Sequence, residues 1–233
     1  MTPKDVPPHP TCASCPIVKR ADRRCIRPDG KAPPNCPTAA KPEVIEQSLA
    51  TYTSGKFAAF AQAACQVERA GYGPAPGGGL TACRPRIVET VDFARRMGYK
   101  KLGLVFCMGL RSEAKITAEI LETNGFAVVS AICKVGCTPK TAIGARPEDL
   151  LNPANPESIC NPVMQAMLMN AATVEFNILL GLCVGHDSLA LAHLDAPATV
   201  LAVKDRLMAH NPVAPLYMYN GYCQYLHNPL FPS

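Results

Sequence analysis

The chain of 233 residues contains no tryptophan, and its aromatic residues make up only 6% of the total. It also lacks a long apolar segment. The longest apolar runs, at 102–108 and 178–184, fall well short of the roughly 20 residues that a membrane-spanning helix needs. The first ten residues lack the apolar core of a signal peptide. We therefore expect a cytoplasmic protein without a membrane partner.

Several sequence motifs of common enzyme classes are absent as well. There is no Walker sequence and no G-x-G-x-x-G after a strand, and the glycines at 77–79 have no strand before them. G-x-S-x-G and H-E-x-x-H are also missing. The net charge of +5 is too small by itself to indicate a nucleic-acid partner. These absences leave the cysteines as the main chemical signal.

The 12 cysteines are many for a chain of this length. Small secreted proteins use such numbers for disulfides, because their cores are too small to stabilise them. This chain has no export signal, and its hydrophobic content of 48% is sufficient for a core. In a reducing compartment, many cysteines indicate metal binding or catalysis.

Residues 1–41 form a distinct segment. They contain nine prolines and eight of the 23 lysines and arginines, and they show no apolar periodicity. Such a stretch cannot build a core and stays disordered unless something cross-links it. We therefore predict two parts, a cysteine-rich metal-binding segment at 1–41 and an α/β domain with a helical lead-in at 42–233.

The second part changes from helices to alternating strands and helices. Helical spacing comes first, at 43–51, 57–69 and 86–97, with a flexible loop expected at 71–80. Strands are expected at 101–107, 127–133, 176–183 and 199–203. Helices are expected at 112–124, from 162 onward, and at 187–194, with Ser112 and Asn161 as caps. This alternation predicts a Rossmann-like α/β fold with a mostly parallel sheet flanked by helices.

The N-terminal segment carries four cysteines in the spacing C-x2-C-x9-C-x10-C. A C-x2-C turn presents two thiolates to one metal, and two more from a later loop complete a tetrahedral site. Zinc is the default for this pattern, although Cys-Pro pairs also occur among iron–sulfur ligands. The basic residues in between either contact phosphate or only keep the segment soluble. The expected ligands are Cys12, Cys15, Cys25 and Cys36.

A second group of cysteines follows the strands. Cys107, Cys133 and Cys183 end the first three strands, and Cys160 precedes the helix cap at Asn161. The carboxyl ends of parallel strands share one edge, where such folds bind ligands. Four thiolates there could hold a [4Fe–4S] cluster or zinc. Alternatively, Cys107 and Cys183 are small buried hydrophobic residues.

The remaining cysteines give weaker signals. Cys137, in CKVGC, and Cys223 are possible further ligands. Cys65 lies on an alanine-rich helix and is expected in the core. Cys83 follows the glycine-rich loop and is ambiguous.

Polar residues accompany these cysteines on the same edge. His186 is a candidate proton donor or metal ligand. The role of Asp187 could be limited to capping the helix. Lys204 and Arg206 end the fourth strand, where they bind an anionic substrate group or are simply solvated. His210 follows closely and could add a hydrogen bond. The candidate catalytic or substrate-binding residues are therefore His186, Lys204, Arg206 and His210.

The chain resembles an uncharacterised prokaryotic family of predicted metal-binding proteins with a zinc-finger-like N-terminus. The matching stretches are 86–114, CKVG (133–136), CNP (160–162), NILLGLCVGHDS (177–188), VKDR (203–206), HNP (210–212), the N-terminal C-x2-C and NCP (35–37). This resemblance implies metal binding by Cys107, Cys133, Cys160, Cys183 and the N-terminal four. At Cys137 the family pattern accommodates serine equally well. The resemblance implies no particular reaction.

Two hypotheses about function follow. In the first, the protein is an iron–sulfur enzyme or redox protein whose [4Fe–4S] cluster binds at the carboxyl edge, with zinc at the N-terminal site. Its partner is then a small anionic or sulfur-containing substrate, or an electron-transfer protein. In the second, it is a non-catalytic zinc protein that acts as a carrier, a sensor or a nucleic-acid-binding module.

Overall fold

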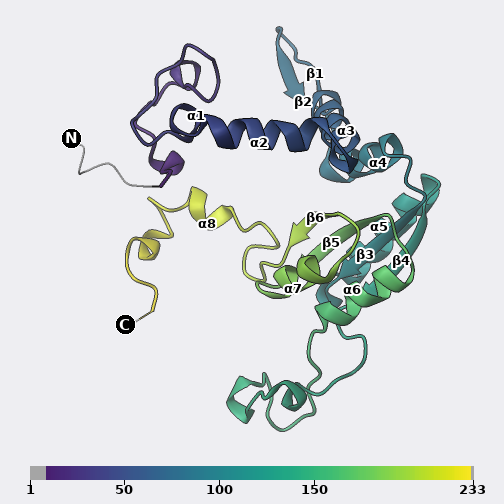
Figure 1. Cartoon of the computed structure of the whole chain (residues 1–233). Helices are drawn as coiled ribbons and strands as arrows, with labels where there is room; N and C mark the ends of the chain where they lie inside the picture. Colours follow the sequence, from purple (N-terminus) through teal and green to yellow (C-terminus); the bar gives the residue numbers. More distant parts are fainter. Residues whose placement is uncertain (1–8, 232–233) are drawn as a thin grey trace. The chain divides into compact units, whose positions relative to one another are not determined.

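The structure is a computed structural model that describes residues 9–231 (Figure 1). The first eight residues, which contribute to the expectations about a signal peptide and a cysteine-rich segment, lie outside the described residues. The chain divides into two compact units, Met1–Gln66 and Val67–Ser233. This boundary falls within helix α3 (Lys56–Ala70), whereas composition alone places one after residue 41.

The described part of the first unit consists of turns and helices in which Ala63 is the one buried residue. Short 3-10 turns at Cys12–Ser14 and Arg20–Asp22 precede α1 (Pro37–Ala40) and α2 (Pro42–Thr53). None of the described residues 9–55 is buried. The predicted helix at 43–51 is confirmed, and proline occupies its first turn as expected.

The prediction that Cys65 belongs to the core is wrong, because its side chain is exposed. On α3 the buried residues are Ala63 and Val67. Each lies two positions from Cys65, which is a rotation of about 200° around a helix. Cys65 therefore occupies the opposite, solvent-facing side.

A small hairpin replaces the flexible loop expected at 71–80. Strand β1 (Tyr72–Pro74) pairs antiparallel with β2 (Leu80–Ala82). The connecting glycines, Gly77, Gly78 and Gly79, all have positive φ angles between 83° and 99°. Only glycine adopts such angles readily, so the glycine run supplies the turn that brings the two strands together.

The second unit contains a four-stranded parallel sheet, which confirms the α/β class. The strand order is β4-β3-β5-β6. β3 lies at the centre beside β5, and the next strand in sequence, β4, pairs on its other side. The strand bounds are Lys101–Phe106 for β3, Ala127–Ile132 for β4, Phe176–Leu182 for β5 and Ala198–Val203 for β6.

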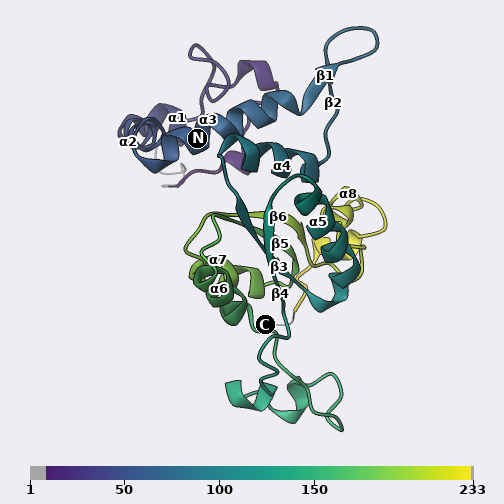
Figure 2. The same ribbon diagram turned by 90° about the vertical axis from the view of Figure 1, so that its right-hand side faces the viewer.

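Helices flank this sheet on both faces, with α6 (Pro162–Ala171) and α7 (His186–His193) on one side and α5 (Arg111–Thr123) on the other (Figure 2). Helix α4 (Arg86–Arg96) precedes the first strand of this sheet. A four-residue helix, α8 (Ala214–Tyr217), lies in the C-terminal tail, for which no element was expected.

Two of the three expected helix starts need correction. Asn161 caps α6 as predicted, since its Oδ1 accepts a hydrogen bond from the Met164 amide at 3.0 Å. Helix α5, however, continues directly from a 3-10 turn at Met108–Leu110, so Ser112 lies inside it rather than at its cap. The N-cap of α7 is Gly185, and Asp187 lies in the first turn.

The core sits around β3 and β5. All seven residues of β5 are buried, as are the central residues of β3. The most deeply buried large side chains include Leu102, Leu104, Ile178, Leu179 and Met169. Within residues 9–231, no helix combines the length and the apolar character needed to cross a membrane.

Candidate functional site

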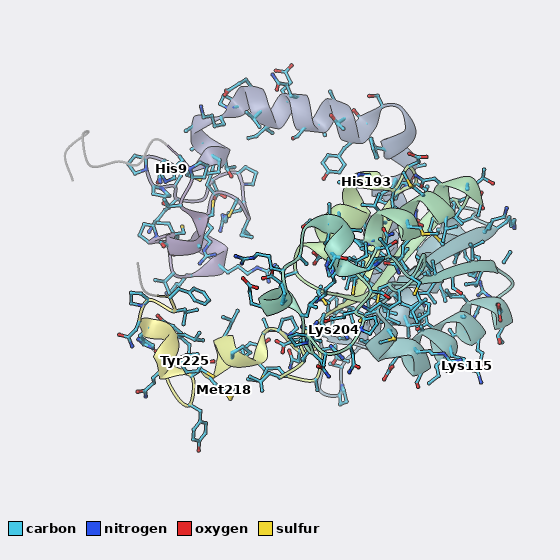
Figure 3. The ribbon with its side chains drawn as sticks, turned by 90° about the horizontal axis from the view of Figure 1, so that it is seen from below. His9, Lys115, His193, Lys204, Met218 and Tyr225 are labelled. Atoms are coloured by element: carbon cyan, nitrogen blue, oxygen red, sulfur yellow. The ribbon has the colours of Figure 1, made fainter. Side chains whose placement is uncertain are left out.

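One cavity of about 670 Å³ lies at the carboxyl edge of the sheet. It brings together the second group of predicted residues, from the strand ends, the loop after β4 and the segment after β6. In Figure 3, Lys204 is labelled at this edge among the side chains that gather there. The sequence-predicted residues that line the cavity are Cys107, Cys133, Cys160, Cys183, His186, Lys204, Arg206 and His210.

The parallel register places Cys107 and Cys133 side by side. The last register pair between β3 and β4 is Phe106 with Ile132, and the two cysteines follow immediately. The Cys133 amide continues the ladder by donating to the Phe106 carbonyl at 2.9 Å. The Met108 amide donates to the Cys133 sulfur at 3.3 Å, so that sulfur lies against the chain just after Cys107.

Cys160 is held beside the same strand end. The Asn161 amide donates to the Cys133 carbonyl at 2.7 Å, which ties the start of α6 to the end of β4. Since Asn161 also caps α6, Cys160 lies directly before the helix. The side chain of Cys160 is close enough to hydrogen-bond that of Cys133.

Cys183 follows β5 and is paired with a cation rather than with another thiol. The Arg206 guanidinium donates to its sulfur through Nη2 at 3.0 Å. The Cys183 carbonyl accepts hydrogen bonds from the His186 and Asp187 amides at the start of α7. Three sulfurs thus form a contiguous group, and the fourth lies across the cavity in contact with Arg206.

The environment separates the acidities of two neighbouring thiols. Burial disfavours the Cys107 thiolate, but the Gly109 amide and the Lys204 ammonium outweigh it through hydrogen bonds, so the pKa of Cys107 is lowered. Burial, reinforced by Cys160 and Cys107, raises the pKa of Cys133 to about 12 despite the Met108 amide. Cys107 therefore ionises first.

The polar wall of the cavity is mainly cationic. It contains Lys134, Lys140, Lys204 and Arg206. Glu157 is the one carboxylate among the described residues that line the cavity, and it pairs with Lys140 at 2.9 Å. A field of this sign favours anions, both thiolates of the protein and a bound ligand.

The two histidines of the cavity have different surroundings. Burial and the charges of Lys134 and Arg206 lower the pKa of His186 against the opposing effect of Asp187. His210 accepts a hydrogen bond at Nδ1 from the Asp205 amide at 3.2 Å. Both His210 and the preceding Ala209 have positive φ angles, 63° and 48°, which cost energy in residues with a side chain.

The N-terminal cysteines surround a separate, smaller cavity. Its volume is about 100 Å³, and its lining includes all four cysteines of the predicted site, Cys12, Cys15, Cys25 and Cys36. Asn35 steadies this segment by donating to the Thr11 hydroxyl at 2.8 Å. The four thiols therefore face one space although no core supports them.

Across residues 9–231, no group of three or more histidines, cysteines, aspartates or glutamates lies close enough together to hold one metal ion. A single tetrahedral zinc would require its thiolates to be about 3.8 Å apart, as follows from Zn–S bonds of about 2.3 Å. Binding of one ion at either cavity would therefore have to draw the thiols closer together. The two thiol-lined cavities supply the right donors but not this spacing.

The other cysteines lie outside both cavities among the described residues. Cys137 is exposed, with its sulfur 3.5 Å from the Ser158 hydroxyl. Cys223 is buried at 4% exposure. Cys83 is exposed and its sulfur lies 3.4 Å from the Gly71 carbonyl.

Sequence reasoning missed three charged residues that line the main cavity and one buried residue that hydrogen-bonds the strand ends beside it. Lys134, Lys140 and Glu157 belong to the stretch around the long loop, where periodicity gives no information. Gln165 lies on α6 and is fully buried, with Nε2 donating to the Phe106 and Ala131 carbonyls at 3.1 and 2.7 Å. A glutamine on the otherwise apolar face of PVMQAMLM is the signal that could have found it.

Comparison with known proteins identifies relatives without a described activity. The chain is 40% identical over 134 residues to the uncharacterized protein MJ0455 of Methanocaldococcus jannaschii, a match that covers 58% of this chain and 67% of the relative. No solved structure matches. Residues 36–201, which include every cysteine of the main cavity, match a family described as "Protein of unknown function (DUF1847)". The chain belongs to this family.

Proposed function

We propose that this protein is an iron–sulfur enzyme or redox protein whose [4Fe–4S] cluster is held by Cys107, Cys133, Cys160 and Cys183. The observation that carries the proposal is the convergence of these four thiols, from four separate segments, on one cavity. Their position also supports it. The strand order reverses between β3 and β5, and Rossmann-like sheets bind ligands at the carboxyl end of such a reversal.

The donor set fits a cluster better than a single ion. In a cluster each thiolate binds a different iron, so the sulfurs stand further apart than around one zinc. The four thiols line one cavity, but among the described residues no three of them gather around a single point. The cations Lys134, Lys204 and Arg206 line the same cavity and offset the negative charge of several thiolates.

When bound through all four thiolates, the cluster would supply electron transfer; only an iron without a protein thiolate would polarise a ligand atom. The chain's own residues bind and orient the substrate. Lys204 and Arg206 attract its anionic group, and His210 presents Nε2 because Nδ1 is occupied by the Asp205 amide. Burial and nearby cations lower the pKa of His186, which favours the neutral imidazole, a donor at one ring nitrogen and an acceptor at the other.

The N-terminal site favours zinc as a second, structural metal. Its four cysteines line one small cavity in a segment without any buried residue. Metal binding would supply the folding free energy that this segment lacks, and it would draw the thiols together. The alternative function, a non-catalytic zinc protein acting as carrier, sensor or nucleic-acid-binding module, would place zinc in both cavities.

Anaerobic purification followed by iron, zinc and acid-labile sulfide analysis tests the proposal. We expect about four irons and four sulfides per chain and a visible absorption band. Cys183→Ala should lose the cluster, whereas Cys83→Ala, whose thiol lies outside both cavities, should keep it. A colourless protein that contains only zinc and resists cluster reconstitution would favour the alternative function. Unchanged iron in Cys183→Ala would overturn this ligand assignment.

A further inference from the structure

We propose that the metal-free chain carries a dithiol–disulfide exchange site, formed by Cys107 and Cys133, that reacts with low-molecular-weight disulfides bearing carboxylates. This activity goes beyond the proposed function, because it needs no metal. It is argued from the placement of the two thiols and from the charge of the cavity wall.

The backbone places the two cysteines at the separation that a disulfide requires. They directly follow the last pair of the β3–β4 register, Phe106 with Ile132, and the Cys133 amide still donates to the Phe106 carbonyl at 2.9 Å. Neighbouring strands are about 4.8 Å apart, and disulfides bridge Cα atoms about 4.4–6.8 Å apart. Both cysteines line the cavity at the carboxyl edge, so their side chains face the same space.

Side-chain contacts agree with this placement. The Cys133 sulfur accepts the Met108 amide at 3.3 Å, one residue beyond Cys107. The two sulfurs are themselves within hydrogen-bonding reach of each other. A bond between them would therefore join two thiols that already lie beside each other.

Unequal exposure assigns the two roles. Cys107 is partly exposed and lines the cavity, so an external disulfide can reach it. Cys133 lines the same cavity but is only 3% exposed. The accessible thiol therefore attacks the external disulfide, and the neighbouring thiol resolves the mixed disulfide within the same chain.

The positive charge of the cavity wall determines which disulfides bind near Cys107. The Lys204 ammonium hydrogen-bonds the Cys107 sulfur, and Arg206 contacts Cys183 across the cavity. The carboxylate of Glu157 is already paired with Lys140. A carboxylate-bearing disulfide would thus meet one cation beside the attacking sulfur and others in the cavity wall, and a cationic disulfide would be repelled.

The substrate disulfide is the oxidant of this reaction, so atoms and electrons balance without a further reagent. The Cys107 thiolate attacks one sulfur of the substrate, the substrate's S–S bond breaks, and the first thiolate leaves. The Cys133 thiol then loses its proton and attacks the Cys107 sulfur, and the second thiolate leaves. The two protons of the cysteines end on the two released thiols, and two electrons pass from the protein to the substrate.

Peptide mapping tests the pairing in the full-length chain. Protein stripped of metal and reductant is equilibrated with oxidised and reduced glutathione, alkylated and digested with trypsin. Cys107 lies in the tryptic peptide 102–111 and Cys133 in 116–134, while Cys160 and Cys183 share 141–204. We expect the 102–111/116–134 cross-link to form at the most reducing ratio. A dominant link from 116–134 to 141–204, or alkylated Cys107 and Cys133 beside other oxidised cysteines, would overturn the proposal.

Two further measurements test the roles and the charge preference. Cys133→Ser should accumulate glutathione on Cys107, which the wild type does not. Cys107 should react about tenfold faster with oxidised glutathione than with cationic cystamine, and Lys204→Gln should reduce this ratio. The exposed Cys65 of the same molecule is the internal control and should show little preference. Equal preference at Cys65 and Cys107 would refute charge selection. Because all samples are metal-free, these results do not depend on the iron content that tests the proposed function.

Discussion

The two edges of the parallel sheet use charged groups differently. At the amino edge, the Glu175 carboxylate accepts hydrogen bonds from the Lys100 and Lys101 amides at 2.6 and 2.9 Å. At the carboxyl edge, Arg206 donates to Cys183 and Lys204 to Cys107. Charges at the first edge are matched by backbone groups, and those at the second by ionisable thiols.

This difference separates stability from chemistry within one sheet. A carboxylate held by two backbone amides is a fixed contact that ties the starts of β3 and β5 together. A cation beside a thiol instead favours the thiolate, which is the form that binds metal or attacks a disulfide. Substitutions at the carboxyl edge should therefore change metal content and reactivity, and those at the amino edge should change only stability.

The largest expected effect is a loss of iron at the carboxyl edge. Cys160→Ser should remove nearly all of the cluster iron, because Cys160 lines the cavity beside Cys133. Cys137→Ser is the matched control, since this exposed cysteine of the same loop lies outside the cavity lining. Iron and sulfide analysis of both anaerobically purified variants decides the point. Equal iron loss in both variants would return Cys137 to the ligand set.

Much of the fold was predictable because local patterns dominate it. Apolar runs identified β3, β4 and β5, and Asn161 with Pro162 marked the start of α6. The hairpin at β1 and β2 was missed because glycines indicate a turn without showing which flanking residues pair. The exposure of Cys65 was missed because an alanine-rich helix has no strong apolar side.

The members of the carboxyl-edge site were predictable for a topological reason. Residues that follow parallel strands must meet at one edge, so Cys107, Cys133 and Cys183 could be grouped from sequence. The loop residues Lys140 and Glu157 could not. They reach the cavity because the loop closes on itself through a bridge between Pro139 and Ser158, which no periodicity indicates.

A smaller effect is expected from added methyl groups at the two edges. Gly181, in β5, has a φ of 69°, and a Cβ there would lie 2.6 Å from Leu110 Cδ1. Gly181→Ala should therefore lower the free energy of unfolding by about 3 kcal/mol, through both strain and overpacking. Gly125→Ala is the matched variant near the amino edge, with a φ of 91° and open space around it. It should cost only about 1 kcal/mol, from strain alone.

Denaturant unfolding of both glycine variants measures this difference. Metal content should also fall in Gly181→Ala, because the residue lies two positions before Cys183. It should be unchanged in Gly125→Ala. Equal destabilisation of the two variants would show that contact with Leu110 does not restrict the carboxyl end of β5.

The smallest expected effect lies at the amino edge and depends on pH. The hydrogen bonds from the Lys100 and Lys101 amides hold the pKa of Glu175 below its ordinary value of 4.5. A depressed carboxyl pKa stabilises the folded state above the unfolded pKa, and this contribution is lost as the pH falls through the folded pKa. Glu175→Gln, which resembles the protonated form, should cost about 1 kcal/mol at neutral pH because the side chain is exposed. The difference from wild type should shrink below pH 4.5.

Glu119→Gln, which removes an exposed ion pair with Lys115, should have almost no effect at either pH. A pH-independent cost at Glu175 would mean that the carboxylate charge does not hold the two strands together.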